Sequence, residues 1–314
     1  MPSGERCLIA STDVQRSAVA DIVDGVGNFS LSVYYPSVRS DARWRSTTML
    51  QTVNFCGLTV TRLILGANPF GGYSHQNSAR DREMVAYYTV DRIIETWGRA
   101  EAAGINTMIT NNESPHVVQA VREYLSGGGK LQWIAQVNCR LQPDMERALD
   151  EAVEIGCKAI YIHGGQVDNL FCRKDEATLR RWCNHARSLG VPIGCAGHTP
   201  EAHKWVDALE VTDFHAVPFF TCGSIHNGEG EKFSLSDMLR AVACIKEIQQ
   251  PCIGYKIMGA GRLDPRMAFE YAYESIKPGD VVNVGMYRGD KDDMVEENVA
   301  FAREFLSRTA NNKS

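Results

Sequence analysis

The sequence predicts an α/β fold of the (β/α)8 class, the TIM barrel, on three observations. From residue 62 onward, short apolar runs of strand length alternate with amphipathic stretches of helix length. Eight such pairs can be counted, which favours closure into a barrel over an open doubly wound sheet. The loops after the strands are long and polar, whereas those after the helices are short. The functional face is therefore expected at the carboxyl ends of the strands.

The predicted strands are short apolar runs, and several of the helices that follow them have a recognisable start. Ser114 and Thr199 each stand as an N-cap before a proline at the first helical position. In chain order, the strands are expected over Arg62–Gly66, Ile105–Ile109, Leu131–Val137, Ala159–Ile162, Val191–Cys195, Phe214–Pro218, Cys252–Lys256 and Val281–Val284. Helices are expected over Arg82–Ala103, from Pro115, over Pro143–Ile155 and Asp175–Leu189, and from Pro200, Ser234, Asp264 and Lys291.

The chain divides into two parts of different character. Residues 1–50 are rich in Ser and Arg and have no sustained period, so they are predicted to be a poorly ordered N-terminal extension. A capping strand pair over the barrel bottom is the alternative for this segment. Residues 51–314 are predicted to form a single barrel, because barrels of this class commonly occupy about 250 residues.

Charge and apolar patterning limit the partners. The formal net charge of -5 and the pI of about 5.9 give no attraction to nucleic acid or to an anionic membrane. No apolar run reaches the roughly 18 residues of a membrane-spanning helix, and the start lacks the apolar stretch of a signal peptide. We therefore expect a cytoplasmic protein with a small-molecule substrate, and the oligomeric state is left open. The ten cysteines include no CxxC pair, which favours reduced, buried packing residues.

Two histidines stand at the carboxyl ends of neighbouring predicted strands. His163 ends an apolar strand before two glycines, and His198 ends the next strand after Gly197. An imidazole there can donate a hydrogen bond to a substrate oxygen, relay a proton or bind a metal. The other interpretation is an orienting residue satisfied by the backbone. Further acidic and imidazole groups lie in nearby loops: Glu113, Asp168 and His226.

A lysine and several glycines mark the last two strands. Lys256 lies within GYKIMGAGR, where apolar surroundings would lower its pKa and allow it to act as a base, Schiff-base former or anion anchor. A salt bridge across the barrel mouth is the alternative. Gly259 and Gly261 permit close approach of the backbone to an anionic group. The segment Gly285–Arg288 is expected on the adjacent strand, and phosphate sites in these barrels often form from the last two loops.

Motifs in barrel order resemble those of the aldo-keto reductase superfamily, from about Leu58 to the carboxyl end. LTVTRLILGANPFGG is similar to the family's first strand and loop, and GINTMIT to its second strand. YIHGG, IGCAGHTPE and GYKIMGAGR are similar to its fourth, fifth and seventh strands, and the closing VVNVGMYRGDKDDMVEEN is the most specific match. The resemblance implies the (β/α)8 fold and an NADP cofactor.

The resemblance also implies roles for individual residues. His163 matches the family's catalytic histidine, which orients the substrate carbonyl, and Tyr255 matches an aromatic residue that stacks on the nicotinamide. The remaining positions implied for the cofactor site are Gly259, Gly285, Met286, Arg288, Glu297 and Asn298.

Three of the family's four catalytic positions are changed. Its aspartate aligns with Ile109, its tyrosine falls within Asn111-Asn112-Glu113, and its lysine aligns with Gln136. A reductase needs an acid to protonate the alkoxide as hydride arrives, and that tyrosine normally supplies it. His163 or Glu113 would have to replace it here. The candidate catalytic residues are therefore His163, Glu113, Lys256 and His198.

Three functions fit these observations. The first is a divergent NADP-dependent oxidoreductase that acts on a small carbonyl or sugar-like substrate. The second is a metal-dependent isomerase, lyase or hydrolase of a sugar or polyol. Its zinc or manganese would be bound by His163 and His198 with Glu113, Asp168 or His226 from nearby loops. The third is a non-catalytic ligand-binding barrel, since a fold alone does not secure a function.

Overall fold

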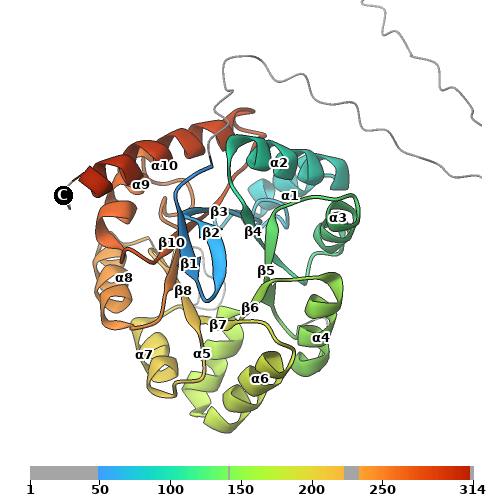
Figure 1. Ribbon diagram of the computed structural model, residues 1–314, viewed down its shortest axis with the longest axis vertical. Helices are drawn as coiled ribbons and strands as arrows, with labels where there is room; N and C mark the ends of the chain where they lie inside the picture. The colour runs from blue at the N-terminus through green and yellow to red at the C-terminus, as the bar shows by residue number, and fades with distance from the viewer. Residues whose placement is uncertain (1–48, 141, 223–232, 312–314) are drawn as a thin grey trace, which may run out of the picture. The chain divides into compact units, whose positions relative to one another are not determined.

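Eight parallel strands close into a barrel in the computed structural model of this protein (Figure 1). The structure describes residues 49–140, 142–222 and 233–311. The strands pair in the order β10, β3, β4, β5, β6, β7, β8, β9, and β9 closes onto β10, so the predicted fold class is confirmed. The strands are β3 Leu63–Gly66, β4 Thr107–Asn111, β5 Gln132–Val137, β6 Ala159–Ile162, β7 Ile193–Ala196, β8 Phe214–Pro218, β9 Cys252–Tyr255 and β10 Val281–Gly285.

The helices form a ring around the barrel (Figure 1). Two of the predicted strands, β6 and β8, have the observed bounds, and the other six begin or end within two residues of them. The helices are α1 Ser78–Tyr87, α2 Val90–Ala103, α3 Pro115–Ser126, α4 Met145–Ile155, α5 Gly164–Arg173, α6 Glu176–Ser188, α7 Pro200–Ala208, α8 Ser236–Glu247, α9 Pro265–Ser275 and α10 Met294–Asn311.

The first predicted helix was wrong as a single element. The stretch Arg82–Ala103 is divided between α1 and α2, and the chain leaves the helical conformation at Tyr88 and Thr89. The Thr89 side chain accepts a hydrogen bond from the backbone N–H of Arg92 and so caps α2. A capping threonine satisfies one of the free N–H groups of a helix start, which explains why a new helix begins here.

Helix α5 was not predicted, although it supplies part of the site described below. It follows β6 directly, and the side chain of His163 is its N-cap: Nδ1 accepts a hydrogen bond from the backbone N–H of Gly165 at 3.0 Å. The two glycines at its start indicated a loop, because glycine disfavours a helix interior.

An antiparallel hairpin closes the amino-terminal end of the barrel. Its strands are β1 Thr52–Phe55 and β2 Leu58–Thr61. The rings of Phe55 and Phe214 lie 5.2 Å apart in an edge-on arrangement, and both side chains are fully buried inside the barrel. Phe214 is the first residue of its strand, which places the hairpin at the barrel floor. A strand pair was expected as an alternative from residues 1–50, but this one lies just beyond them. Residues 1–48 and His226 are outside the described residues.

The nine described cysteines are all free, and six of them are buried, as their packing role predicts. Cys172 is exposed. In the described part of the chain, no helix combines the length and the apolar character needed to cross a membrane.

Candidate functional site

His163 lies at the carboxyl end of β6, at the barrel mouth. Because its Nδ1 accepts from the Gly165 N–H, the neutral ring carries its proton on Nε2. Nε2 is then a hydrogen-bond donor, which is what a residue that orients a carbonyl oxygen requires.

His198 follows β7 and is held by a carboxylate from α5. Asp168 Oδ2 lies 2.5 Å from His198 Nδ1, and Oδ1 accepts from the His198 backbone N–H at 3.0 Å. Burial disfavours the ionised carboxyl group, but the hydrogen bonds from His198 outweigh burial and lower the pKa of Asp168. The ionised carboxylate keeps a proton on Nδ1, so Nε2 is the basic atom of neutral His198.

The two histidines are neighbours at the mouth, as the sequence predicts. A Cβ atom placed on Gly164 would lie 2.9 Å from His198 Cε1, so the His198 ring lies directly against the residue that follows His163. In their neutral forms, one Nε2 donates and the other accepts. This pair can both orient and exchange a proton with a substrate oxygen.

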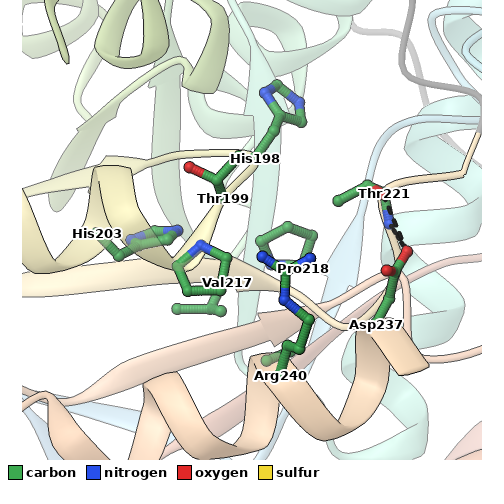
Figure 2. Close-up of a pocket in the computed structure, with 10 residues that line it drawn as sticks. His198, Thr199, His203, Val217, Pro218, Thr221, Asp237 and Arg240 are labelled. Carbon is green, nitrogen blue, oxygen red and sulfur yellow. Dashed lines mark hydrogen bonds between the residues drawn. The ribbon is translucent and has the colours of Figure 1, made fainter. Parts of the chain in front are cut away.

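His198 also borders a cavity of about 240 Å³ beside α8, which we call the α8 cavity. His198, Thr199 and His203 line this cavity, and Figure 2 shows Thr199 and His203 across Pro218 from Thr221 and Asp237. On the opposite wall, the Asp237 carboxylate accepts hydrogen bonds from Thr221.

The expected metal trio of His163, His198 and Glu113 does not converge. Glu113 is turned toward Arg140, whose Nε lies 2.8 Å from Glu113 Oε1 in an ion pair that lacks hydrogen-bond alignment. The ring of His198 is turned toward Asp168. Within the described residues, the group of three possible ligands that does converge is a different one: Cys195, His203 and His215.

This second cluster was missed by the sequence analysis, which considered only the ends of strands. Burial lowers the pKa of His203 to about 4 and lowers the pKa of His215 well below its usual value. Both imidazoles are therefore neutral.

A second cavity, of about 280 Å³, lies among the loops that follow β3, β9 and β10, and we call it the β10 cavity. Two buried amide atoms in its wall, Asn283 Oδ1 and Asn298 Nδ2, have no hydrogen-bond partner among the described residues. Leaving such an atom unsatisfied costs about 1–3 kcal/mol. Its lining includes Asn68, Arg80, Lys256, Asn283, Gly285, Glu297 and Asn298.

Lys256 brings a positive charge to the β10 cavity. Burial lowers its pKa to about 8, and the nearby Arg262 also lowers it. The alternative of a salt bridge is not realised, because the structure gives Lys256 no carboxylate partner in the described part of the chain. A buried ammonium group without a counter-charge is suited to binding an anion.

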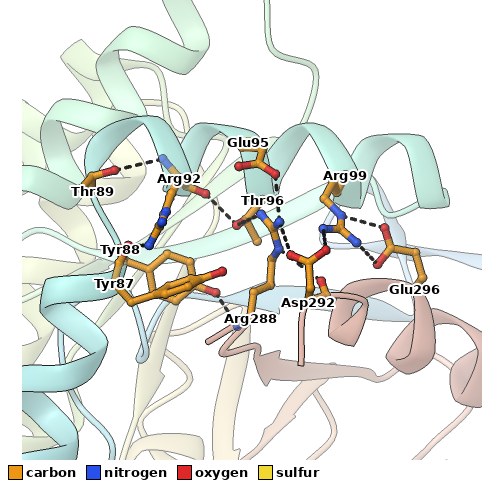
Figure 3. Close-up of polar contacts among 10 residues, drawn as sticks. All are labelled: Tyr87, Tyr88, Thr89, Arg92, Glu95, Thr96, Arg99, Arg288, Asp292 and Glu296. Carbon is orange, nitrogen blue, oxygen red and sulfur yellow. Dashed lines mark hydrogen bonds and ion pairs between the residues drawn. The ribbon is translucent and has the colours of Figure 1, made fainter. Parts of the chain in front are cut away.

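Arg288 does not line the β10 cavity. Its guanidinium group faces α2 and Asp292, with Nη2 2.8 Å from Glu95 Oε1 and 2.6 Å from Asp292 Oδ1 (Figure 3). Its Nη1 donates to Thr96 at 3.2 Å. The arginine is thus part of an ion-pair network between α2 and the start of α10, and its assignment to a phosphate stays a prediction without support from this geometry.

Three further predicted cofactor residues lie at the edge of this region. Tyr255 is packed against the barrel interior, and its ring centroid lies 5.9 Å from Lys256 Nζ. Met286 is fully buried, and its carbonyl oxygen accepts from the Tyr88 hydroxyl group at 2.6 Å. Gly259 has a φ of 55°, and a Cβ there would lie 2.6 Å from the Phe233 ring. Gly259 therefore allows the conformation of the loop after β9, and it does not line the β10 cavity.

Two hydrogen bonds join the loops on either side of the β10 cavity. Gln76 Nε2 donates to the Ala260 carbonyl oxygen at 2.9 Å, and Arg262 Nη2 donates to the His75 carbonyl oxygen at 3.1 Å. They link the loop after β3 to the loop after β9. We call these two bonds the loop bridge.

Comparison with known proteins shows a likeness of structure. A scan against protein-family models and a search of curated proteins gave no match. PA4992 of Pseudomonas aeruginosa, described as a candidate aldo-keto reductase, superposes with a TM-score of 0.58 at 18% identity, over 85% of this chain and 100% of that one. A second candidate aldo-keto reductase structure from that organism gives a TM-score of 0.57 at 17% identity, over 83% and 96%. The superpositions show that the chain shares the (β/α)8 barrel fold of these two structures.

The barrel mouth differs from the aldo-keto reductase pattern at the positions that the sequence motifs indicated. Ile109, where the family has an aspartate, is buried in the apolar barrel interior. Gln136, where the family has a lysine, accepts a hydrogen bond from the Tyr161 hydroxyl group at 2.7 Å, and burial raises the pKa of Tyr161. The structural likeness shows the fold alone, so the chemistry has to be argued from the local groups.

Proposed function

We propose that this aldo-keto reductase-like barrel is a divergent NADP-dependent oxidoreductase that acts on a small carbonyl or sugar-like substrate. The observation that carries the proposal is the pair of unsatisfied amide atoms in the β10 cavity, Asn283 Oδ1 and Asn298 Nδ2. A ligand that offers a donor and an acceptor would remove the cost of leaving them unpaired. Because both lie beside the last strand, where these barrels often bind phosphate-bearing ligands, a dinucleotide is the favoured ligand.

The residues present fit one half of such a cofactor. Asn298 and Glu297 offer hydrogen-bonding groups to a base, and Lys256 offers a positive charge to a phosphate. Ligand pockets commonly measure about 300–1,000 Å³, and the β10 cavity, at about 280 Å³, lies at the lower end of this range. Its size therefore suits an adenosine-sized group better than a whole dinucleotide. Arg288 is not needed for this fit.

The mouth residues can supply the acid that the family's tyrosine provides. NADP(H), when bound, supplies the hydride. His163 Nε2 would donate a hydrogen bond to the substrate oxygen and orient the carbonyl group. Protonated His198 would give the proton on Nε2 to the developing alkoxide, and Asp168 would keep the remaining proton on Nδ1.

A fluorescence titration with NADPH tests the cofactor. We expect saturable binding by the unaltered protein and an affinity about fivefold lower for Asn298→Leu, since one hydrogen bond is worth about 1 kcal/mol. Arg240→Ala, in the α8 cavity, is the control and should bind like the unaltered protein. If the unaltered protein shows no saturable binding, the proposal is wrong.

A panel of small aldehydes, ketones and sugars tests the reaction, with NADPH consumption as the readout. The oxidoreductase would be supported if the unaltered protein turns over any of these substrates and the His198→Gln variant turns it over more slowly. NADPH binding without turnover of any substrate would instead support the non-catalytic barrel. The metal-dependent alternative at His163, His198 and Glu113 has no comparable support, because these groups do not converge.

A further inference from the structure

Three buried side chains with metal-binding atoms meet in the layer between the barrel and α7. Cys195 of β7 and His215 of β8 are register partners in neighbouring strands, and both point outward toward the helices. His203 lies in the first turns of α7 and points back toward them. None of the three is more than 1% exposed. They come from three elements, so their meeting is a product of the fold.

Two of the three distances within the cluster are close to those between the ligands of one tetrahedral ion. His203 Nδ1 lies 3.2 Å from His215 Nδ1, which lies 3.4 Å from Cys195 Sγ. All three atoms fall within 4.8 Å of one another. Zinc bonds of about 2.0–2.1 Å to nitrogen and 2.3 Å to sulfur place tetrahedral ligands about 3.3 Å apart for two nitrogens and about 3.6 Å apart for nitrogen and sulfur.

The outer nitrogen of His203 faces an acceptor, and that of His215 faces a hydroxyl group that can accept, so both ring protons can point away from the cluster. His203 Nε2 lies 3.3 Å from the Gly197 carbonyl oxygen, which can only accept. His215 Nε2 lies 3.3 Å from Thr212 Oγ1 and 4.0 Å from the Asp207 carboxylate. With protons on both Nε2 atoms, the lone pairs of both Nδ1 atoms face each other. Metal-binding histidines have this arrangement, in which the outer N–H is held by a carbonyl or carboxylate.

We propose that Cys195, His203 and His215 form a zinc-binding site. Two imidazoles and a thiolate are a ligand set that zinc favours, and the thiol would lose its proton to solvent on binding. Where zinc has three protein ligands, water takes the fourth position. His203 also lines the α8 cavity, which provides a path for the ion and the water. The site is distinct from the β10 cavity and does not depend on NADPH binding.

The site would position the mouth as well as stabilise the fold. Through His203, the ion would be linked to the Gly197 carbonyl group, and Gly197 directly precedes His198. Zinc would therefore fix the loop that carries His198, as a positioning element outside the reacting groups.

The first experiment uses the full chain, purified without chelators and with any affinity tag removed. Mass spectrometry of the metals should find about one zinc per chain, the stoichiometry of a mononuclear site. Protein stripped with a chelator should melt several degrees lower and recover with Zn²⁺ but not with Mg²⁺. Cobalt added to the stripped protein should give the charge-transfer band of a thiolate bound to Co²⁺.

Variants assign the ligands. Cys195→Ser should abolish the cobalt-thiolate band. His203→Gln should weaken the affinity for Zn²⁺ by at least about tenfold, because loss of a ligand should cost no less than loss of an outer-shell partner. Cys183→Ser is the matched control, because Cys183 is equally buried and belongs to no such cluster in the described residues. It should retain both the zinc and the cobalt band.

The same atoms can be joined by protons alone, and this arrangement gives the opposite result. Thr212 would donate to His215 Nε2, and His215 Nδ1 would donate to His203 Nδ1. In that case the unaltered protein contains no zinc, its melting temperature does not respond to Zn²⁺, and no cobalt-thiolate band forms. These results, obtained on the unaltered protein, would overturn the proposal even if a variant fails to fold.

Discussion

The two sides of the barrel mouth use polar groups differently. On the side of β6 and β7, polar side chains hold one another, as in Asp168 with His198 and His163 with the start of α5. On the side of β3 and β10, Asn283 and Asn298 leave buried amide atoms without a partner in the wall of a cavity.

The difference indicates that one side of the mouth is preorganised before a substrate arrives, whereas the other side is suited to binding a ligand. Groups that satisfy one another fix the direction of a proton before a substrate arrives, and their removal should weaken the fold. Groups that lack a partner cost stability until a ligand pairs with them, and their removal should strengthen the fold while it weakens binding. Substitutions on the two sides should therefore have effects of opposite sign.

The largest effect is expected on the satisfied side. Asp168→Ala removes the acceptor of two hydrogen bonds from His198 and should lower the free energy of unfolding by about 2–3 kcal/mol. Urea denaturation followed by tryptophan fluorescence measures it. Asp175→Ala, which removes a partly buried helix cap, is the control and should cost about 1 kcal/mol. A loss no larger than that of the control would contradict the special role of Asp168.

Asp280, a buried carboxylate at the opposite end of the barrel, tests whether hydrogen-bond partners are enough to make a polar group stabilising. It has such partners, and its ionised form still lowers stability at neutral pH. Asp280 accepts from the backbone N–H groups of Cys252 and Lys277, each at 2.8 Å, yet burial raises its pKa to about 6. Between the unfolded pKa of about 4 and the folded pKa, the folded state binds more protons, so stability falls as the pH rises.

This fall should amount to on the order of 2 kcal/mol between pH 4 and pH 7. Urea denaturation at several pH values measures the slope, and Asp280→Asn should flatten it. Asp168 acts in the other direction, because its lowered pKa makes the fold lose stability only as the pH falls below about 4. An equal slope in the unaltered protein and in Asp280→Asn would show that other groups set it.

A smaller effect of opposite sign is expected in the β10 cavity. Asn298→Leu replaces a buried, unpaired amide with an apolar side chain of similar size and should raise the free energy of unfolding by up to about 1 kcal/mol. The same variant should bind NADPH more weakly. If it is less stable than the unaltered protein by as much as Asp168→Ala, the amide has a structural partner and the two sides do not differ as stated.

The smallest effect is expected in the ion-pair network of Figure 3. Glu95 is partly exposed and shares Arg288 with Asp292, so Glu95→Gln should change the free energy of unfolding by no more than about 0.5 kcal/mol. NADPH affinity should stay the same. A gain in affinity would instead show that Glu95 restrains Arg288 from reaching a phosphate, which would support the role implied by the family resemblance.

The sequence was sufficient for the barrel because each strand is a short apolar run of its own. The sequence-based prediction was wrong where the same local pattern is compatible with two different secondary structures. The amphipathic stretch Arg82–Ala103 did not reveal that Thr89 caps a second helix. The glycines after His163 indicated a loop, although His163 itself caps the helix that they begin.

The site was predicted in part. Residues at strand ends were recognised, since topology brings the carboxyl ends of parallel strands to one face. The sequence did not reveal the partners of Asp168 and Glu113, which are His198 and Arg140. Asp168 was expected in a loop but lies in the unpredicted helix α5, and the contact of Glu113 depends on the conformation of loops. The Cys195 cluster points outward, and strand alternation places Cys195 and His215 on the helix-facing side. Only the position of α7 brings His203 to them.

The loop bridge is expected to affect the rate at which a ligand leaves the β10 cavity and not the affinity of the cavity for the ligand. Gln76 and Arg262 join two loops that border the β10 cavity, so separation of these loops requires both hydrogen bonds to break. The wall of the cavity would then set how tightly a ligand is held, and the bridge would set its residence time. Such a bridge lets exchange rates change through residues that never touch the reacting atoms.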